Sequence, residues 1–328
     1  MMRDAIINFP NQFKWTPKIE GGKIKKYKRF LVCGMGGSHL AAGLLQMIKP
    51  DLDIIIHRSY GLPNLTEDLW KKRLVIISSY SGNTEEVIDG LIEAQKRNLP
   101  TVIITKGGKL LELAKQNNLS FVQIPDTGIQ PRSSLGFQFL GLLKILKLSE
   151  MQKEIKSLAK LLSPKNIEPL GKHLAGKLRG HVPVIYASTK NEALAYNWKI
   201  KFNETGKIPA FYNTVPELNH NEMTGFDRKP SSEELSKSFF FIFLKDTTDH
   251  PRITKRFEIL QKLYEDRGLP VEAISINASQ AQIGAESILY DIFYSLLIAD
   301  WAAMFTAESY GLESEQVPMV EEFKDLIK

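Results

Sequence analysis

The sequence predicts an α/β protein with two doubly wound domains, each a parallel sheet covered by helices on both faces. Short apolar, β-branched runs recur along the chain, and each is followed by a turn rich in Gly or Ser and then by a segment with helical periodicity. Continuous apolar strands that alternate with helices are typical of parallel sheets. The length of 328 residues exceeds one ordinary core and suits two domains.

The expected strands fall into two sets, five in the first half of the chain and four in the second. In the first half they are 30–33, 54–57, 74–78, 101–105 and 121–124, and in the second half 182–187, 209–212, 239–244 and 271–276. A Lys-rich helical stretch near 149–165 separates the two sets. We therefore expect an N-terminal domain over 1–150, a helical linker over 151–175 and a C-terminal domain over 176–328.

Composition limits the classes of function. The net charge is +6, but apart from a short basic cluster at 23–29 the basic residues alternate with acids, which suits anionic metabolites better than nucleic acid. The single cysteine excludes an intrachain disulfide and a Cys-rich zinc site, which indicates a reducing cytoplasm. Residues 1–10 lack the apolar core of a signal peptide.

One segment is apolar enough to raise the question of a membrane span. Residues 288–307 are apolar over about twenty positions. Asp291 and Asp300 interrupt the segment, and ionisable residues are rare within membrane-spanning helices. We expect a helix buried in a domain or in a dimer interface, and no membrane partner.

The turn after the first strand has the sequence Gly34-Met35-Gly36-Gly37-Ser38-His39. The third glycine of a dinucleotide fingerprint would fall at His39, and no Gly-Lys-Ser/Thr follows for a P-loop, so both motifs fail. A close backbone approach at Gly36 and Gly37, with Ser38 at the helix start, is what remains. A plain tight turn with a capping serine is the simple alternative.

The turn after the third strand carries a stronger signal, Ser79-Tyr80-Ser81-Gly82-Asn83-Thr84. Thr84 is placed to cap the following helix, whose first turn begins with two acids. Three hydroxyls and free helix-terminal amides can surround a phosphate without a cationic side chain. A capped turn that binds nothing is the alternative, but it would not need so many hydroxyl and amide groups.

A carboxylate and an imidazole lie close together in the sequence of the second half. Asn203-Glu204 ends an expected helix, and Pro216-Glu217-Leu218-Asn219-His220-Asn221-Glu222 follows soon after. Together with the hydroxyl-rich turn they suggest proton transfer on a phosphorylated small molecule. The alternatives are a solvent-facing acid at a helix end and a histidine that only bonds within its own turn.

These residues carry a family resemblance. The Gly36-Gly37-Ser38 and Ser79 to Thr84 turns resemble the two signature turns of the SIS, or sugar isomerase, fold. Pro131-Arg132, Asn203-Glu204, the segment 216–222 and Lys324 resemble the bifunctional phosphoglucose/phosphomannose isomerases, in the right order and over nearly the whole chain. The resemblance implies two SIS-type, flavodoxin-like domains and a homodimer that acts on hexose 6-phosphates.

The resemblance also implies a role for each matching residue. Gly37, Ser38, Ser79, Ser81 and Thr84 would hold the sugar phosphate. Glu204 would move a proton between C1 and C2, and Arg132 would stabilise the enediolate. His220, reaching in from the partner subunit, and Lys324 would assist ring opening.

The chemistry needs these residue types. A carboxylate can take and return a proton on one face, a permanently charged guanidinium suits a developing oxyanion, and an imidazole titrates near neutrality. Arg132 could instead be a surface arginine at the start of an expected helix over 133–148, although a cation there opposes the helix dipole. Lys324 could be an ordinary solvated lysine near the chain end.

Dual specificity for glucose and mannose phosphates depends on a small residue facing the sugar. In the family that the chain resembles, a small residue, often Thr, replaces a longer Gln. Two helical turns before Lys324 the chain has Val317, with Gln316 beside it. Val317 would leave the pocket roomy, whereas Gln316 would make turnover of mannose 6-phosphate doubtful.

We expect neither a metal nor a cofactor. His220-Asn221-Glu222 matches one half of a zinc deaminase motif, but the cysteine half cannot exist with Cys33 alone. Other readings remain open: an SIS isomerase for an amino sugar or pentose phosphate, and a non-enzymatic SIS sensor of sugar phosphates. Such a sensor usually has a helix-turn-helix ahead of its domain, for which 1–28 is too short, and it would need neither Glu204 nor His220.

Overall fold

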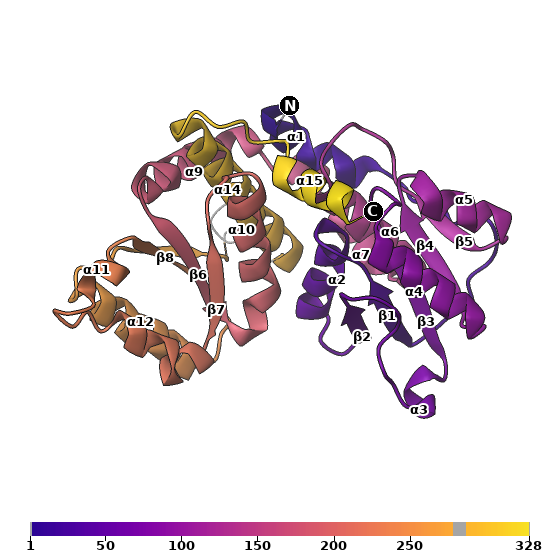
Figure 1. Ribbon diagram of the computed structural model, residues 1–328, viewed down its shortest axis with the longest axis horizontal. Helices are drawn as coiled ribbons and strands as arrows, with labels where there is room; N and C mark the ends of the chain where they lie inside the picture. The colour runs from indigo at the N-terminus through magenta and orange to yellow at the C-terminus, as the bar shows by residue number, and fades with distance from the viewer. Residues whose placement is uncertain (1, 278–286, 328) are drawn as a thin grey trace. The chain divides into compact units, whose positions relative to one another are not determined.

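The two-domain α/β fold class is confirmed by a computed structural model of the chain, which describes residues 2–277 and 287–327 (Figure 1). Two parallel sheets are present, one of five strands and one of four. Every expected strand forms. The largest shift concerns the expected strand 209–212, which runs over Phe211–Val215. Pro209 has no N–H for the ladder, which explains the later start.

The first unit covers Asn8–Leu161 and contains the five-stranded sheet, in the order β2-β1-β3-β4-β5. Its strands are β1 (Arg29–Cys33), β2 (Asp53–His57), β3 (Arg73–Ser78), β4 (Thr101–Thr105) and β5 (Ser120–Gln123). Its helices are η1 (Phe9–Lys14), α2 (Gly37–Ile48), α3 (Glu67–Trp70), α4 (Glu85–Lys96), α5 (Gly108–Gln116), η2 (Pro131–Ser133), α6 (Leu135–Leu146), α7 (Ser149–Ile155) and α8 (Leu158–Leu161).

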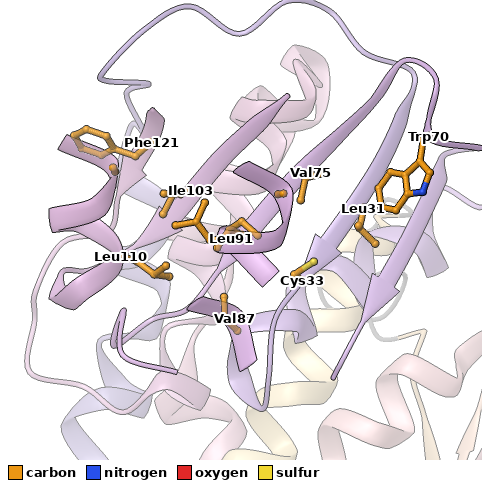
Figure 2. Packing of buried hydrophobic residues seen from close by; sticks show 12 residues of the cluster. Leu31, Cys33, Trp70, Val75, Val87, Leu91, Ile103, Leu110 and Phe121 are labelled. Carbon is orange, nitrogen blue, oxygen red and sulfur yellow. The ribbon is translucent and has the colours of Figure 1, made fainter. Parts of the chain in front are cut away.

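Helices cover both faces of this sheet because alternate strand residues point to opposite sides. Leu31, Val75 and Ile103 pack against Val87 and Leu91 of α4 and Leu110 of α5, and all of them are buried (Figure 2). On the other face α2 contacts α6. Residues such as Val32 and Ile76 are likewise buried, so the strands are apolar throughout rather than alternating.

The second unit combines Met1–Ile7 with Leu162–Lys328 and contains the four-stranded sheet, in the order β7-β6-β8-β9. Its strands are β6 (Val182–Ser188), β7 (Phe211–Val215), β8 (Phe239–Lys245) and β9 (Val271–Ser275). Its helices are α1 (Met2–Ile7), α9 (Pro164–Leu178), η3 (Thr189–Asn191), α10 (Glu192–Glu204), η4 (Glu217–His220), η5 (Glu222–Phe226), α11 (Glu233–Ser236), α12 (Pro251–Glu265), α14 (Ile288–Ser309) and α15 (Pro318–Leu326).

The apolar segment near the chain end is a core helix of this unit. Helix α14 packs against α9 and α10, and nearly all of its residues are buried. Asp300 forms an ion pair with Lys201 of α10 at 2.5 Å, and both side chains are buried. The Trp198 indole donates to Ser295 at 3.0 Å. Partners within the unit thus satisfy Asp300 and Ser295 in the buried helix.

The division into units differs from the expected domain limits. Residues Met1–Ile7 cluster with the second unit rather than with the first, where Arg3 bonds Glu168 at 2.6 Å. The expected linker 151–175 is not a separate element, because α7 and α8 belong to the first unit and α9 to the second. Apolar burial rather than sequence order decides these assignments: Met2 and Ile6 are buried.

Candidate active site

The hydroxyl-rich turn after β3 forms a compact network in the first unit. The Ser79 hydroxyl lies 2.8 Å from the Thr84 hydroxyl and accepts the Gly82 N–H at 3.1 Å. The Ser81 hydroxyl accepts the Asn83 N–H at 3.2 Å. Thr84 occupies the N-cap position of α4, but its side chain bonds no helix amide. The expected position of Thr84 at the helix start is thus confirmed, but its hydroxyl meets Ser79 instead of a helix amide.

A second turn, which the sequence analysis missed, supports this network. Gly82 has φ of 74°, and a Cβ at this position would lie 1.8 Å from the Gly107 carbonyl oxygen. Leu110 N–H donates to the Gly82 carbonyl, and the Asn83 side chain accepts the Lys109 N–H. The available signal was the glycine pair after β4, Gly107-Gly108. Only glycine permits this close approach of two turns.

The turn after β1 joins the same network. The Ser38 hydroxyl accepts the Tyr80 N–H at 2.9 Å, and the Ser78 hydroxyl donates to the Ser38 carbonyl at 2.8 Å. Gly36, with φ of 49°, precedes the helix that starts at Gly37, so Ser38 lies within α2 and is not its cap. The simple alternative of a capping serine is thus wrong. Both signature turns contribute hydroxyls to one end of the sheet.

Arg132 lies beside these turns and is not a surface residue. Arg132 is only 3% exposed. It belongs to the short helix η2, which precedes α6. The backbones of Gly37 and Arg132 approach each other closely, since a Cβ on residue 37 would lie 3.0 Å from the backbone nitrogen of Arg132. The surface-arginine alternative is therefore wrong. The expected helix over 133–148 runs instead over Leu135–Leu146.

Two ionisable side chains at this end of the sheet are uncharged at neutral pH. Burial, together with the positive charge of Arg58, lowers the pKa of His39 from 6.5 to about 4, against the opposing effect of a backbone hydrogen bond with Gly36. His39 is therefore neutral at neutral pH. Burial and the nearby Asp126 raise the pKa of Tyr80 to about 12. Arg58 brings positive charge near His39, and Lys106 and Asp126 bring opposite charges near Tyr80.

In the second unit, Glu204 is the last residue of α10 and is half-buried. The Lys207 ammonium donates to the Glu204 carbonyl oxygen at 2.7 Å and also to the Gln316 carbonyl oxygen. Lys207 thus joins the end of α10 to the segment that carries Gln316 and Val317. Sequence reasoning missed Lys207, and only its position three residues after Glu204 could have drawn attention to it.

His220 and Lys324 are both exposed. His220 ends η4, in the loop that follows β7, and Lys324 forms an ion pair with Glu321 at 2.7 Å on α15. Val317 is half-buried at the N-cap of α15, while the Gln316 side chain is exposed. The structure thus places Glu204, Gln316 and Val317 in one neighbourhood.

The second sheet has its own polar cluster at the carboxyl ends of β6 and β8. Asp246 accepts hydrogen bonds from Lys190 at 2.9 Å and from Asn191 at 3.0 Å. Burial opposes ionisation, but these bonds and those from Thr248 hold the pKa of Asp246 well below its usual range. Within residues 2–277 and 287–327, no group of three His, Cys, Asp or Glu side chains is arranged to hold a metal ion.

Comparison with known proteins places this geometry in a family. The profile of the bacterial phospho-glucose isomerase C-terminal SIS domain matches residues 167–327. A solved structure, the C-terminal domain of glucosamine-fructose-6-phosphate aminotransferase from Francisella tularensis, superposes with a TM-score of 0.68 over 96% of this chain and 98% of that one. Its 14% identity supports the shared fold alone.

Similar sequences cover nearly the whole chain. The chain is 34% identical to the bifunctional phosphoglucose/phosphomannose isomerase of Aquifex aeolicus, over 99% of this chain and 97% of that one. It is 30% identical to the enzyme of the same name from Thermoplasma acidophilum, over the full length of both. A D-glucosamine-6-phosphate 4-epimerase from Sulfolobus acidocaldarius is 26% identical over 92% of this chain and 90% of its own. The chain therefore belongs to the family of bifunctional phosphoglucose/phosphomannose isomerases.

Proposed function

We propose that the protein interconverts glucose 6-phosphate and mannose 6-phosphate with fructose 6-phosphate through a cis-enediolate, without a metal or cofactor. The observation that carries this proposal is the network that joins the Ser38 turn to the Ser79 to Thr84 hydroxyls, with buried Arg132 next to Gly37, in a chain whose relatives are named for both isomerase activities. The hydroxyls and backbone amides hold the phosphate. Arg132 supplies fixed positive charge for the oxyanion.

Glu204 is the proposed base that moves the proton between C1 and C2. A half-buried carboxylate at a helix end can reach substrate and still exchange its proton. Glu204→Gln should lower kcat by at least ~10²-fold while a phosphorylated sugar acid still binds. Unchanged turnover in this variant would remove Glu204 from the role of base.

His220 and Lys324 are the proposed groups for opening the sugar ring, with His220 supplied by the partner subunit of a homodimer. The exposure of His220 supports this assignment, because a ring held at the surface can reach a neighbouring subunit. Mixing Glu204→Gln with His220→Ala tests it. If the two residues come from different subunits, a mixed dimer regains one intact site and part of the activity. No recovery after subunit exchange would place both residues in one chain.

Val317 is the proposed residue that leaves room for either C2 epimer. Its half-buried position near the Glu204 end of α10 supports it over Gln316, whose side chain is exposed and whose carbonyl is bound by Lys207. Dual specificity remains a proposal for this chain. We also propose a reducing, cytoplasmic location, which fits the lone, buried Cys33.

The decisive experiment is NMR of fructose 6-phosphate incubated with the protein in deuterated buffer containing a chelator. Deuterium at C2 of both glucose and mannose 6-phosphates would support the reaction, its dual specificity and its independence of metal. The relative named as a 4-epimerase supports one alternative, inversion at C4 of an amino sugar phosphate. Change at C4 of glucosamine 6-phosphate, with no exchange at C2 of fructose 6-phosphate, would favour that alternative.

A further inference from the structure

The carboxylate of Glu222 is tied to the edge of the second sheet. The Tyr186 hydroxyl, from β6, donates to Oε1, and the Asn213 amide, from β7, donates to Oε2. Tyr186 is fully buried, and its hydroxyl lies 3.4 Å from that of Tyr264. Burial raises the pKa of Tyr186 well above its usual range and that of Tyr264 to about 12. Both hydroxyls therefore stay protonated, and the Tyr186 hydroxyl can donate to the carboxylate at neutral pH.

The residues on both sides of His220 are fixed, whereas its ring is not. Leu218 is fully buried, and the Asn219 side-chain oxygen accepts from Arg256 at 3.2 Å. The Asn221 amide donates to Glu217 at 2.8 Å, and its oxygen accepts the Glu222 N–H. In the part of the chain that the structure describes, no hydrogen bond or ion pair is formed by the His220 ring. The loop thus holds its backbone to the sheet and leaves the imidazole free.

We infer that Glu222 is a positioning residue that fixes the backbone of the His220 loop by clamping it to Tyr186 and Asn213. Glu222 lies two residues after His220, so its two hydrogen bonds to adjacent strands restrict where the histidine backbone can lie. A carboxylate that accepts from two donors is a stronger tether than a single neutral bond. The buried Leu218 anchors the other side of the loop. Pre-organisation of this kind reduces the entropy lost when the ring engages its target.

The inference rests on the proposed role of His220, and a double-mutant cycle separates the two. We expect Glu222→Gln to lower kcat on fructose 6-phosphate by about tenfold with little change in KM, because one of the two bonds is lost and the loop loosens. In a His220→Ala background the same change should have no further effect on kcat. Glu258→Gln, at an exposed acid that pairs with Lys255, is the matched control and should match the wild type.

A second variant guards against simple loss of folding. Tyr186→Phe keeps the ring that packs against Phe241 and Phe243 and removes only the donor. It should reproduce the direction of the Glu222→Gln effect and shift the His220 Cε1–H signal in a proton NMR spectrum. An unaltered signal in both variants would contradict the clamp.

The remaining outcomes separate the positioning role of Glu222 from the proposed role of His220. A Glu222→Gln effect of equal size with and without His220 would overturn the positioning role in favour of general structural support. Impaired His220→Ala with fully active Glu222→Gln would overturn the inference alone. Full activity of His220→Ala would remove His220 from the proposed mechanism, and the positioning role with it.

Discussion

The two sheets share a topology but differ in the chemistry at their switch points. Strand order reverses between β1 and β3 in the first unit and between β6 and β8 in the second, which is where ligands of doubly wound sheets bind. The first switch point has glycines and the hydroxyls of Ser38 and Ser79. The second has Asp246 bound by Lys190 and Asn191.

This difference supports the proposal that the sugar phosphate binds at the first switch point rather than at the second. Hydroxyls and backbone amides can surround a phosphate without carrying a negative charge, so the groups at the first switch point suit an anion. At the second, Asp246 already neutralises Lys190 and would repel a phosphate. The residues proposed for proton transfer and ring opening in the second unit, Glu204 and His220, lie elsewhere, at the end of α10 and in the loop after β7.

The largest expected effect comes from adding a side chain at Gly82, where the turn after β3 meets the turn after β4 in the first unit. Gly82→Ala combines a left-handed backbone with a Cβ 1.8 Å from the Gly107 oxygen. We expect it to lower the free energy of unfolding by roughly 3 kcal/mol and to raise KM at least tenfold. Gly176→Ala is the control, because a Cβ there meets no atom within 4 Å. Urea unfolding and steady-state kinetics measure both, and a Gly82→Ala enzyme with wild-type KM would contradict a rigid cradle.

Removing the cation from the second switch point should affect stability and spare catalysis. Lys190→Met leaves the buried Asp246 without its ion pair, which we expect to cost about 2 kcal/mol, less than a fully buried pair because Lys190 is 43% exposed. Chemical denaturation measures the loss, with Lys153→Met at an exposed pair as control. Values of kcat and KM should stay within about twofold of wild type. A tenfold rise in KM would show that this switch point also binds substrate.

Acid should weaken the two units in separate pH ranges. The pKa of His39 is lowered from 6.5 to about 4, so the unfolded chain binds more protons between these values and stability falls as pH drops from about 6.5 to 4. The loss from His39 should be on the order of 3 kcal/mol. Asp246 has a depressed pKa, so its contribution is lost only below its ordinary value of 3.8. His39→Asn should reduce the fall in melting temperature between pH 6.5 and 4, whereas His173→Asn, at an exposed histidine, should not. The same pH dependence in both variants would contradict the assignment of this fall to His39.

The smallest expected effect is a difference in KM between alanine variants of two buried serines, each at the end of a central strand. Ser79 bonds Thr84 and the Gly82 N–H, while Ser188 donates to Asp249 at 2.8 Å. We expect Ser79→Ala to raise KM for the sugar phosphate by about tenfold, or about 1.4 kcal/mol, with kcat little changed. Ser188→Ala should leave KM unaltered. Similar KM values for the two variants would show that the two switch points do not differ in phosphate binding.

Most of the fold could be predicted because the strands carry a local signal. Apolar, β-branched runs such as 74–78 specify buried parallel strands wherever they occur, and the structure contains every one. The domain limits could not be predicted in the same way. Met2 and Ile6 lie at the start of the chain but pack within the second unit, and such contacts depend on which apolar surface is available, not on local sequence.

Part of the candidate site could also be predicted. The two hydroxyl-bearing turns follow central strands of one parallel sheet, and the carboxyl ends of such strands meet at one edge. The residues that support those turns were missed. Gly107 matters because its carbonyl lies where a side chain on Gly82 would be, and Tyr186 and Asn213 matter because they meet Glu222 across strands. Contacts between residues far apart in sequence leave no periodic pattern.

By itself, the sequence determined the α/β class, the positions of the strands along the chain and the residue types proposed for phosphate binding and proton transfer, because periodicity and turn chemistry are local properties. Only the tertiary structure decided how these residues are used. It buried Arg132 beside Gly37, turned the Thr84 hydroxyl toward Ser79 and anchored the loop of His220, whose ring bonds none of the residues that the structure describes. Packing fixes these outcomes, since each depends on which groups must be buried and which donors they then meet.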